Sequence, residues 1–197
     1  MRGVSENGLG SEKRDELVRR AYAVFYRNGF HATGVDSLIE GSGISKRTLY
    51  KHFKSKEELI EAAIDLYHRV MLQTITDFVG TGDERKPAAR ILRLFDWLDG
   101  ALKSGHRAGC FAINAKLEYA NREAAIEQSC ENYFAELEEF IASLCRRAGC
   151  REPKKLARQL QLIFQGAVVN GQATRDAASA QAAKAAAKVL IDSALRE

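Results

Sequence analysis

Proline and long apolar runs are scarce in this sequence of 197 residues. Only two prolines, Pro87 and Pro153, and few alternating Val/Thr stretches are present, which argues against a predominantly β-structure. No apolar run approaches the roughly 18 residues that a membrane-spanning helix needs, and residues 1–17 lack the apolar segment of a secretory signal. These absences predict a cytoplasmic protein that does not bind membranes.

Signatures of metal, cofactor and catalytic sites are also missing. The four cysteines stand 20, 15 and 5 residues apart, so they form no CxxC pair, and no histidine lies beside them at zinc-binding spacing. Asp65 and His68 form one carboxylate–histidine pair, whereas a dimetal bundle needs this pair on a second helix as well. No phosphate loop or nucleophile–base spacing occurs. We therefore expect reduced thiols, no metal, no cofactor and no enzymatic activity.

Positive charge is concentrated near the N-terminus. The whole chain has a net charge of +4, but residues 1–56 hold 11 Lys/Arg against 6 Asp/Glu, and residues 57–197 hold 19 against 20. Residues 42–56 contain five Lys/Arg and no acidic residue. A basic patch on a nearly neutral body favours a polyanionic partner, with a solvated charged surface as the alternative.

Hydrophobic periodicity predicts an all-α protein of about nine helices. Capping residues, glycines and the two prolines set their boundaries. The expected helices cover residues 11–28, 34–41, 46–52, 56–79, 87–103, 110–121, 123–148, 153–170 and 176–195. The second of them is expected to begin with a capping box formed by Thr33 and Asp36. Because Gly41 and Gly43 allow a tight turn before the third, short helix, the pattern is typical of a helix-turn-helix.

The third helix, residues 46–52, is capped by Ser45 and has two different faces. Leu49 and Phe53 lie about 40° apart on a helical wheel, so the face that carries them is expected to be buried. The opposite face is centred on Lys51, with Arg47 and Thr48 beside it, and these side chains suit base edges in a major groove. The basic and polar residues at its shoulders and just after it suit phosphates; they are Lys46, Tyr50, His52, Lys54 and Lys56.

The stretch GFHATGVDSLIEGSGISKRTLYKHFKSKEELIEAAI resembles the N-terminal domain of the TetR family of transcriptional regulators. The resemblance covers roughly 50 residues. It implies a homodimer that binds double-stranded DNA at a near-palindromic operator, usually as a repressor, and that a small-molecule effector releases. The DNA-binding residues predicted from the helical wheel and this resemblance are Thr33, Ser45, Lys46, Arg47, Thr48, Tyr50, Lys51, His52, Lys54 and Lys56.

The resemblance also divides the chain into a DNA-binding domain, residues 1–56, and a helical ligand-binding and dimerisation domain, residues 57–197. It implies an effector cavity among the helices of residues 60–170. The candidate lining residues are Met71, Phe95, Leu98, Cys110, Phe111, Asn114, Glu118, Tyr133, Leu137 and Phe164. Each of the apolar residues could instead be ordinary core, and Asn114 and Glu118 could instead form an exposed polar face, since they are four residues apart on one helix.

The last two helices have the composition of an association surface. One carries an apolar stripe and the other is rich in alanine, which lets helices approach closely; packing within one subunit is the alternative. The resemblance implies a four-helix bundle with two helices from each subunit. The predicted interface residues are Leu156, Leu160, Ile163, Ala167, Ala182, Ala186, Val189 and Leu190.

Two alternatives keep DNA binding but replace or remove the small-molecule effector. In the first, Cys110 at a helix N-terminus near His106 and Arg107 has a lowered thiol pKa and responds to oxidants or electrophiles. Burial of Cys110 as a small hydrophobic residue would argue against this role. In the second, the protein binds DNA without any effector. Cys145 and Cys150 would pair only under oxidation.

Overall fold

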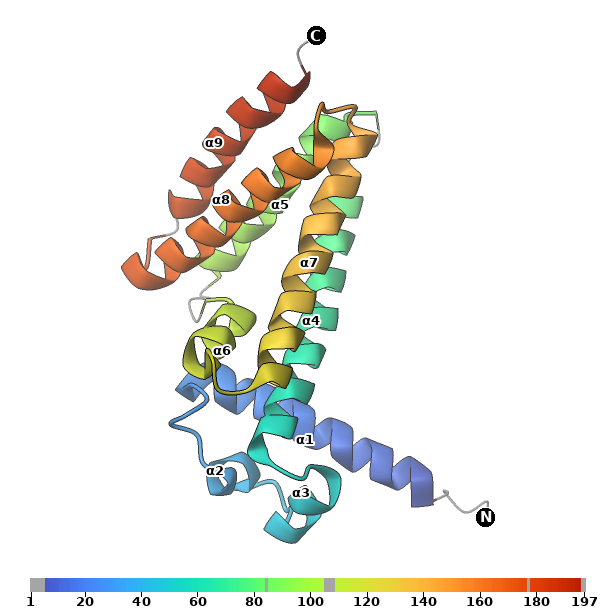
Figure 1. Cartoon of the computed structure of the whole chain (residues 1–197), viewed down its shortest axis with the longest axis vertical. Helices are drawn as coiled ribbons and strands as arrows, with labels where there is room; N and C mark the ends of the chain where they lie inside the picture. The colour runs from blue at the N-terminus through green and yellow to red at the C-terminus, as the bar shows by residue number, and fades with distance from the viewer. Residues whose placement is uncertain (1–5, 84, 105–108, 177, 196–197) are drawn as a thin grey trace. The chain divides into compact units, whose positions relative to one another are not determined.

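The computed structural model describes residues 6–83, 85–104, 109–176 and 178–195. Within these ranges the chain forms nine α-helices and no β-strand (Figure 1), as the periodicity predicts. The helices are α1 (Glu6–Asn28), α2 (Val35–Ile39), α3 (Lys46–His52), α4 (Lys56–Gly80), α5 (Pro87–Lys103), α6 (Phe111–Tyr119), α7 (Ala124–Arg147), α8 (Pro153–Thr174) and α9 (Ala178–Leu195).

Most helix boundaries have the local chemistry that the sequence indicates. Pro87 and Pro153 occupy the first turns of α5 and α8, where a missing N–H is harmless. The hydroxyl of Ser55 accepts a hydrogen bond from Glu58 N at 3.1 Å at the start of α4. Gly29, with φ +81°, and Gly149, with φ +72°, end α1 and α7 in the left-handed conformation that glycine adopts without strain.

Three predicted boundaries are wrong: α1 begins at Glu6 rather than at residue 11, and the predicted end of α8 and start of α2 are each changed by a contact. α8 continues past Asn170 to Thr174 because Gly171 is a packing residue rather than a helix stop. A Cβ atom on Gly171 would lie 2.8 Å from Leu102 Cδ1, so the glycine lets α8 and α5 approach closely. The capping box predicted for α2 does not form, because the Thr33 hydroxyl donates to Gly29 O at 2.6 Å and Gly34 takes the N-cap position.

The helices assemble into two compact units that do not follow the predicted division at residue 56. Unit 1 consists of residues 1–69 and 111–130, and unit 2 of residues 70–110 and 131–197. Unit 1 therefore contains α1, α2 and α3, the first part of α4, all of α6 and the start of α7. The sequence pattern around α6 does not reveal that it packs with the N-terminal helices.

An aromatic cluster explains why α6 belongs to unit 1. Phe111, the first residue of α6, is fully buried. Its ring centroid lies 4.8 Å from that of Phe30, 5.1 Å from Tyr22, 5.6 Å from Tyr67 and 5.9 Å from Tyr26. Offset and edge-on aromatic contacts at these separations are favourable beyond the area they bury. The cluster thus joins α6 to α1, to the start of the turn before α2 and to α4.

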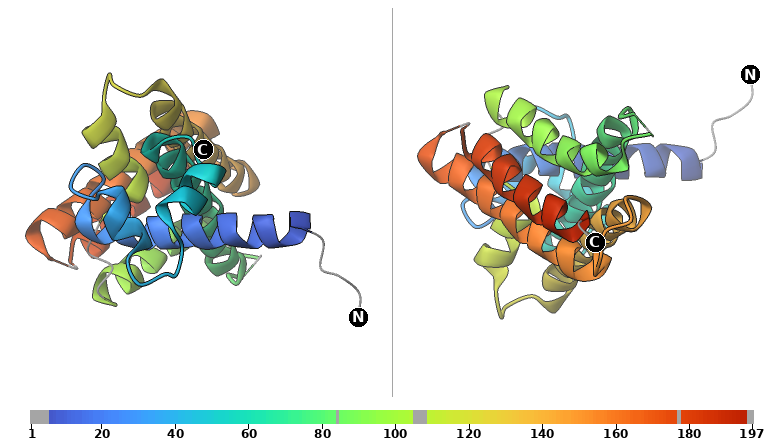
Figure 2. Two further views of the ribbon diagram at one scale, coloured as in Figure 1. Left: turned by 90° about the horizontal axis from the view of Figure 1, so that it is seen from below. Right: turned by 90° about the horizontal axis from the view of Figure 1, so that it is seen from above.

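Unit 2 is organised around α9, which contacts both α5 and α8 and lies between them when viewed from above (Figure 2, right). Phe164 of α8 packs against Phe95 and Trp97 of α5, with ring centroids 6.0 and 6.2 Å apart. The buried amide of Gln161 donates to Phe134 O at 2.8 Å, so this polar group is satisfied inside the unit. None of the described helices is long and apolar enough to cross a membrane.

Candidate nucleic-acid interface

The turn between α2 and α3 is held by a serine between two glycines. Gly41 and Gly43 have φ of +68° and +70°, which only glycine adopts readily. Between them, the Ser42 hydroxyl donates to Ile39 O at 2.6 Å and accepts from Ile44 N at 3.0 Å. These contacts close the turn and set the direction in which α3 leaves it.

α3 is fixed on its inner side and open on its outer side, as the helical wheel predicts. Leu49 and Phe53 are 0% and 1% exposed. The guanidinium of Arg14 from α1 covers the Phe53 ring at 4.9 Å from its centroid. Ser45 caps the helix by accepting from Thr48 N at 3.1 Å. A short helix anchored in this way presents its remaining side chains at defined positions.

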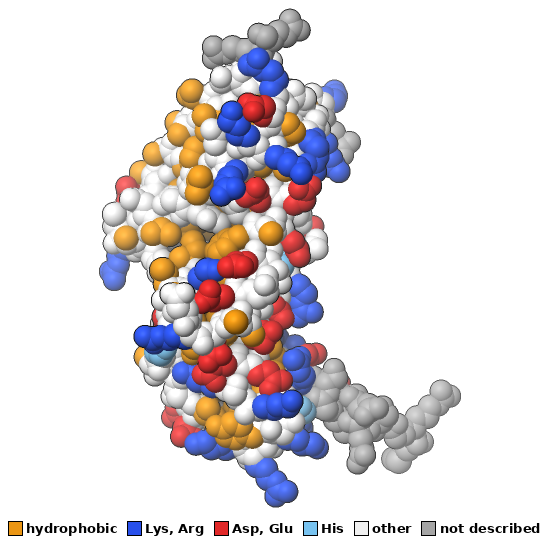
Figure 3. All heavy atoms as spheres, viewed as in Figure 1, with side chains coloured by type: hydrophobic (Ala, Val, Ile, Leu, Met, Phe, Trp, Pro, Cys, Tyr) orange, Lys and Arg blue, Asp and Glu red, His pale blue; other side chains and the backbone are white. Residues whose placement is uncertain are grey.

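The predicted DNA-binding residues fall into three groups by exposure. Ser45, Lys46, Arg47, Tyr50, Lys51 and Lys54 are exposed, and Thr48, His52 and Lys56 are partly buried. Thr33 is only 1% exposed and its hydroxyl is bonded to Gly29 O, so its side chain is not presented to a phosphate. Lys and Arg side chains are prominent at the lower end of Figure 3, where Figure 1 draws α2 and α3.

One cation of this surface has an intramolecular partner. Lys46 Nζ lies 3.0 Å from Asp36 Oδ1 on α2. The hydrogen bond and the charge of Asp36 raise the pKa of Lys46 above its ordinary value, so the ammonium stays charged. Asp36 is predicted from the sequence only as the partner of Thr33 in a capping box, although its position ten residues before Lys46, across the helix-turn-helix, is a usable signal for this ion pair.

Glu118 of α6 contacts the turn that leads into α2. Its carboxylate accepts from Phe30 N at 3.1 and 3.2 Å and from His31 N at 2.8 Å, and it lies 3.0 Å from His31 Nδ1. The His31 ring also stacks on Tyr119, with centroids 4.7 Å apart. Glu118 is predicted either to line an effector cavity or to lie on an exposed polar face, and in the structure its carboxylate binds the α1–α2 turn.

The protonation of Glu118 follows from these contacts. Burial alone would raise the pKa of Glu118, but the hydrogen bonds from His31 N, Phe30 N and the His31 ring outweigh it, so the pKa lies below its ordinary value. A depressed pKa in the folded state means that the stabilisation is complete above the unfolded-state pKa and is lost as pH falls through the folded-state pKa.

We expect the substitution Glu118→Gln to lower the free energy of unfolding by about 1–2 kcal/mol at pH 7, because an amide accepts fewer of these hydrogen bonds and carries no charge. The difference between the two proteins should shrink as pH falls below about 4.5, where the carboxyl of the unfolded chain begins to take up a proton, and further as pH falls through the lower pKa of the folded state. Urea unfolding of both proteins between pH 7 and pH 3.5 measures this difference. A difference that stayed constant with pH would contradict the role of the ionised carboxylate.

The residues predicted to line an effector cavity are divided between the two units. Phe95, Leu98, Tyr133, Leu137 and Phe164 are buried in unit 2, and Met71, in the same unit, is partly buried. Phe111, Asn114 and Glu118 belong to unit 1, where Phe111 is the centre of the aromatic cluster. Phe111 therefore has the position of an ordinary core residue, which is the alternative to lining a cavity.

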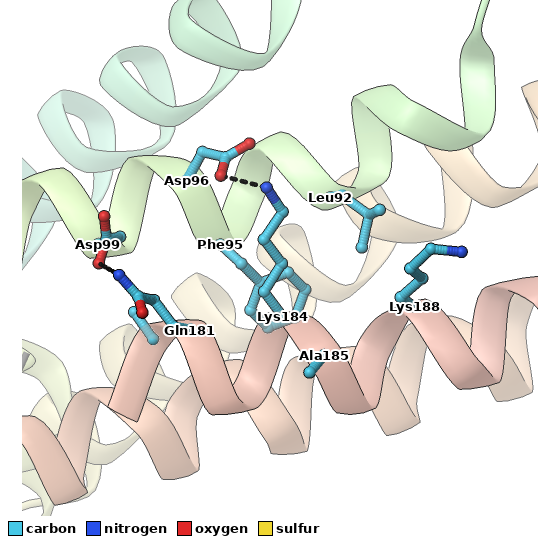
Figure 4. A pocket seen from close by; sticks show the side chains of 9 residues that line it. Leu92, Phe95, Asp96, Asp99, Gln181, Lys184, Ala185 and Lys188 are labelled. Atoms are coloured by element: carbon cyan, nitrogen blue, oxygen red, sulfur yellow. Dashed lines mark hydrogen bonds and ion pairs between the residues drawn. The ribbon is translucent and has the colours of Figure 1, made fainter. Parts of the chain in front are cut away.

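A groove that the sequence did not reveal lies between α5 and α9. It has a volume of about 420 Å³ and shares only Phe95 with the predicted lining residues. Figure 4 shows the acids Asp96 and Asp99 on α5 facing Lys184 and Gln181 on α9, with an ion pair between Asp96 and Lys184. The charged groups of the groove have partners: Lys184 pairs with Asp96, Lys103 with Asp99 and Lys188 with Asp192.

The predicted interface residues of α8 and α9 divide by exposure. Leu156, Leu160 and Ala167 are buried inside unit 2, so they are not available to a second protein molecule. Ile163 and Leu190 are partly buried, and Ala182, Ala186 and Val189 are exposed. The exposed apolar surface also includes Leu162 and Val169 of α8, which are not among the predicted interface residues.

All four cysteines are buried and none is in a disulfide. Cys110 is 7% exposed and directly precedes α6, as predicted, whereas His106 and Arg107 lie outside the described residues. Cys145 and Cys150 flank the Gly149 turn, where Cys150 N donates to Cys145 O at 3.1 Å. Burial raises the pKa of Cys145 to about 12. Such a thiol is a poor nucleophile at neutral pH.

Comparison with known proteins identifies both parts of the chain. Residues 17–63 match the model of "Bacterial regulatory proteins, tetR family", and residues 87–186 match that of "Transcriptional regulator LmrA/YxaF-like, C-terminal domain". The first match contains the helix-turn-helix, and the second covers half of the chain.

Relatives and solved structures agree with these matches. The chain is 33% identical over 95 residues to the HTH-type transcriptional activator FasR of Mycolicibacterium smegmatis, covering 45% of this chain and 41% of that protein. It is 41% identical over 54 residues to the repressor KstR2 of Mycobacterium tuberculosis, covering 27% of each. These curated relatives are thus matched over less than half of their length.

Two solved structures extend the likeness over nearly the whole chain. A protein assigned to the TetR regulators from Streptomyces avermitilis has 28% identity and a TM-score of 0.81 over 93% of this chain and 98% of its own. A TetR-family transcriptional regulator from Streptomyces coelicolor has 20% identity and a TM-score of 0.85 over 94% of this chain and 97% of its own. The second shows likeness of fold alone.

Proposed function

Because the chain belongs to the TetR family and is a DNA-binding transcriptional regulator, we propose that it is a homodimeric repressor that a small-molecule effector releases from a near-palindromic operator. The observation that carries the DNA-binding part is the exposed outer face of α3, where Arg47 and Lys51 project from a helix anchored by Leu49 and Phe53. Arginine and lysine on such a helix suit guanine edges in a major groove.

The direction of regulation rests on analogy. Among the relatives, KstR2 is named a repressor and FasR an activator. Repression is our proposal because a dimer bound over a promoter blocks transcription without further contacts. An effector in unit 2 would act by changing the separation of the two DNA-binding surfaces of the dimer.

Selection from random duplexes tests this function. We expect the purified protein to enrich a short palindrome and to bind it at least 10³-fold more tightly than random DNA at the same salt concentration. Enrichment of no sequence, with weak and strongly salt-dependent binding to every duplex, would contradict a specific regulator. A selected operator then provides the assay for effectors that release DNA.

The same assay separates the proposed effector mechanism from the thiol alternative. If oxidants rather than ligands release the operator, the variant Cys110→Ser should lose that response and keep its affinity for DNA. The burial of Cys110 favours the ligand mechanism, because buried thiols react slowly.

Base reading and phosphate contact should differ in their effects on specificity. We expect Arg47→Ala to weaken operator binding by about 1–3 kcal/mol and to relax the preference at one base position of each half-site. The matched variant Lys54→Ala should weaken operator and random DNA alike and reduce the salt dependence by about one unit per DNA-binding surface. Titrations of both duplexes at several salt concentrations measure these effects. Equal losses on the two duplexes for Arg47→Ala would argue against base reading.

A further inference from the structure

Asp36 places a negative charge beside the first residue of α3. Its carboxylate oxygens lie 3.0 and 3.2 Å from Lys46 Nζ. The side chains are 82% exposed for Asp36 and 52% exposed for Lys46, so the pair stands in solvent on the surface that carries the predicted DNA contacts. An approaching phosphate backbone would therefore meet a neutral pair at this position rather than a bare ammonium.

The other exposed cations of this segment differ from Lys46. Arg47, Lys51 and Lys54 form no ion pair with any carboxylate in the described part of the chain. Residues 42–56 themselves contain no acidic residue. The acid that pairs with Lys46 comes from α2, across the turn, so the pairing results from the geometry of the helix-turn-helix and selects one cation.

This selective pairing matters most for binding without sequence recognition. Such binding is driven by the release of counterions. Each phosphate that a lysine or arginine neutralises makes the slope of log K against log salt concentration more negative by about 0.9. A lysine that already pairs with a carboxylate contributes little to this counterion release, and the carboxylate also repels phosphates. Specific binding gains in addition from base contacts, which Arg47 can make without Lys46.

We propose that Asp36 is a specificity-determining residue, which withholds the ammonium of Lys46 from phosphates and so lowers affinity for random DNA more than affinity for the operator. This inference rests on the DNA-binding function proposed above. It adds an acidic residue of α2 to the set that decides how well the protein distinguishes its site.

A purely structural role for Asp36 makes a different prediction. Asp36 lies in the first turn of α2, where a carboxylate interacts favourably with the helix N-terminus. If that were its whole function, its removal would change stability and leave the salt dependence of DNA binding unaltered. Exposed ion pairs contribute little to folding, so the variants needed for the test should remain folded.

The experiment is a double-mutant cycle of Asp36→Asn and Lys46→Gln, with Glu40→Gln as the control. Glu40 is exposed at the end of α2 and pairs with no cation among the described residues, so its variant has the same charge change without the ion pair. Affinities for the selected operator and for a random duplex of equal length are measured from 50 to 300 mM salt by fluorescence anisotropy.

We expect Asp36→Asn to strengthen binding to random DNA by about 3- to 10-fold at 100 mM salt and to steepen the salt dependence by about 0.9 per DNA-binding surface. Operator affinity should rise less, so the ratio of the two affinities falls. Lys46→Gln should weaken binding to random DNA strongly in the Asp36→Asn background and only slightly in the wild type. Glu40→Gln should show a smaller effect that does not depend on Lys46.

Three results would overturn the inference. They are unchanged binding of random DNA by Asp36→Asn, an equal effect of Lys46→Gln in both backgrounds, and an equal effect of Glu40→Gln and Asp36→Asn. Failure of the proposed function is recognised separately, because the wild-type protein would then select no operator at all.

Discussion

Replacing Phe111 by alanine is expected to lower the free energy of unfolding by about 3–5 kcal/mol. Phe111 is fully buried, and its ring contacts those of Tyr22, Phe30 and Tyr67 at centroid separations of 4.8–5.6 Å. The substitution removes both the buried area and the contacts by which α6 is held to α1 and α4. A loss of this size is a large part of the stability of an ordinary domain.

The effect should be confined first to unit 1, and the sole tryptophan helps to show this. Trp97 lies in unit 2, so its fluorescence reports that unit, whereas far-UV circular dichroism reports all helices. In Phe111→Ala, we expect the dichroism to begin to change at lower urea than the Trp97 signal. Leu117→Ala is the matched control: Leu117 is on the same helix and 75% exposed, and its loss should cost no more than about 0.5 kcal/mol. Similar unfolding curves for the two variants would contradict the packing role of Phe111.

Introducing a charge at Val189 is expected to separate the proposed dimer. Val189 is 65% exposed on α9, and Ala182 and Ala186 precede it by seven and three residues on the same exposed side. The small alanines would let a helix of the second subunit approach closely, so a carboxylate in Val189→Glu would be buried without a partner, which is costly. We expect a monomer at micromolar concentration, observed by sedimentation velocity.

The same substitution should weaken operator binding by at least about 100-fold, because two linked DNA-binding surfaces bind far more tightly than one. Leu117→Glu places the same charge on an aliphatic position that is at least as exposed and lies outside α8 and α9, and it should leave the dimer intact. A Val189→Glu protein that stayed dimeric would show that a different surface joins the subunits.

Local signals account for most of what the sequence predicted. Ser45, Ser55, Gly29 and Gly149 each determine a helix end through contacts within a few residues, and the structure confirms them. The period of 3.6 residues likewise separates Leu49 and Phe53 from the exposed side of α3. Such features depend only on neighbouring residues, so one sequence is sufficient to find them.

The missed features depend on residues far apart in the chain. Glu118 binds backbone groups 87 and 88 positions away. Gly171 of α8 packs against Leu102 of α5, which leaves no room for a Cβ atom. Periodicity says that a helix face is apolar or polar, but it does not say which other helix covers it. For this reason the sequence leaves more than one role open for Phe111, Glu118 and Leu156, such as core packing, cavity lining or contact between subunits. Only the packing of the helices shows which groups each side chain contacts.

The discontinuity of unit 1 has a consequence for how the protein is made. Residues 1–69 lack the surface that α6 supplies until residues 111–130 have been synthesised. At about 5–20 residues per second, the ribosome needs roughly 3–12 s to move from residue 69 to residue 130. During this time the rings of Tyr22 and Phe30 lack the Phe111 ring that covers them in the finished fold. The nascent N-terminal helices are therefore expected to depend on chaperones, and a truncated gene product ending after residue 69 should aggregate rather than compete for the operator.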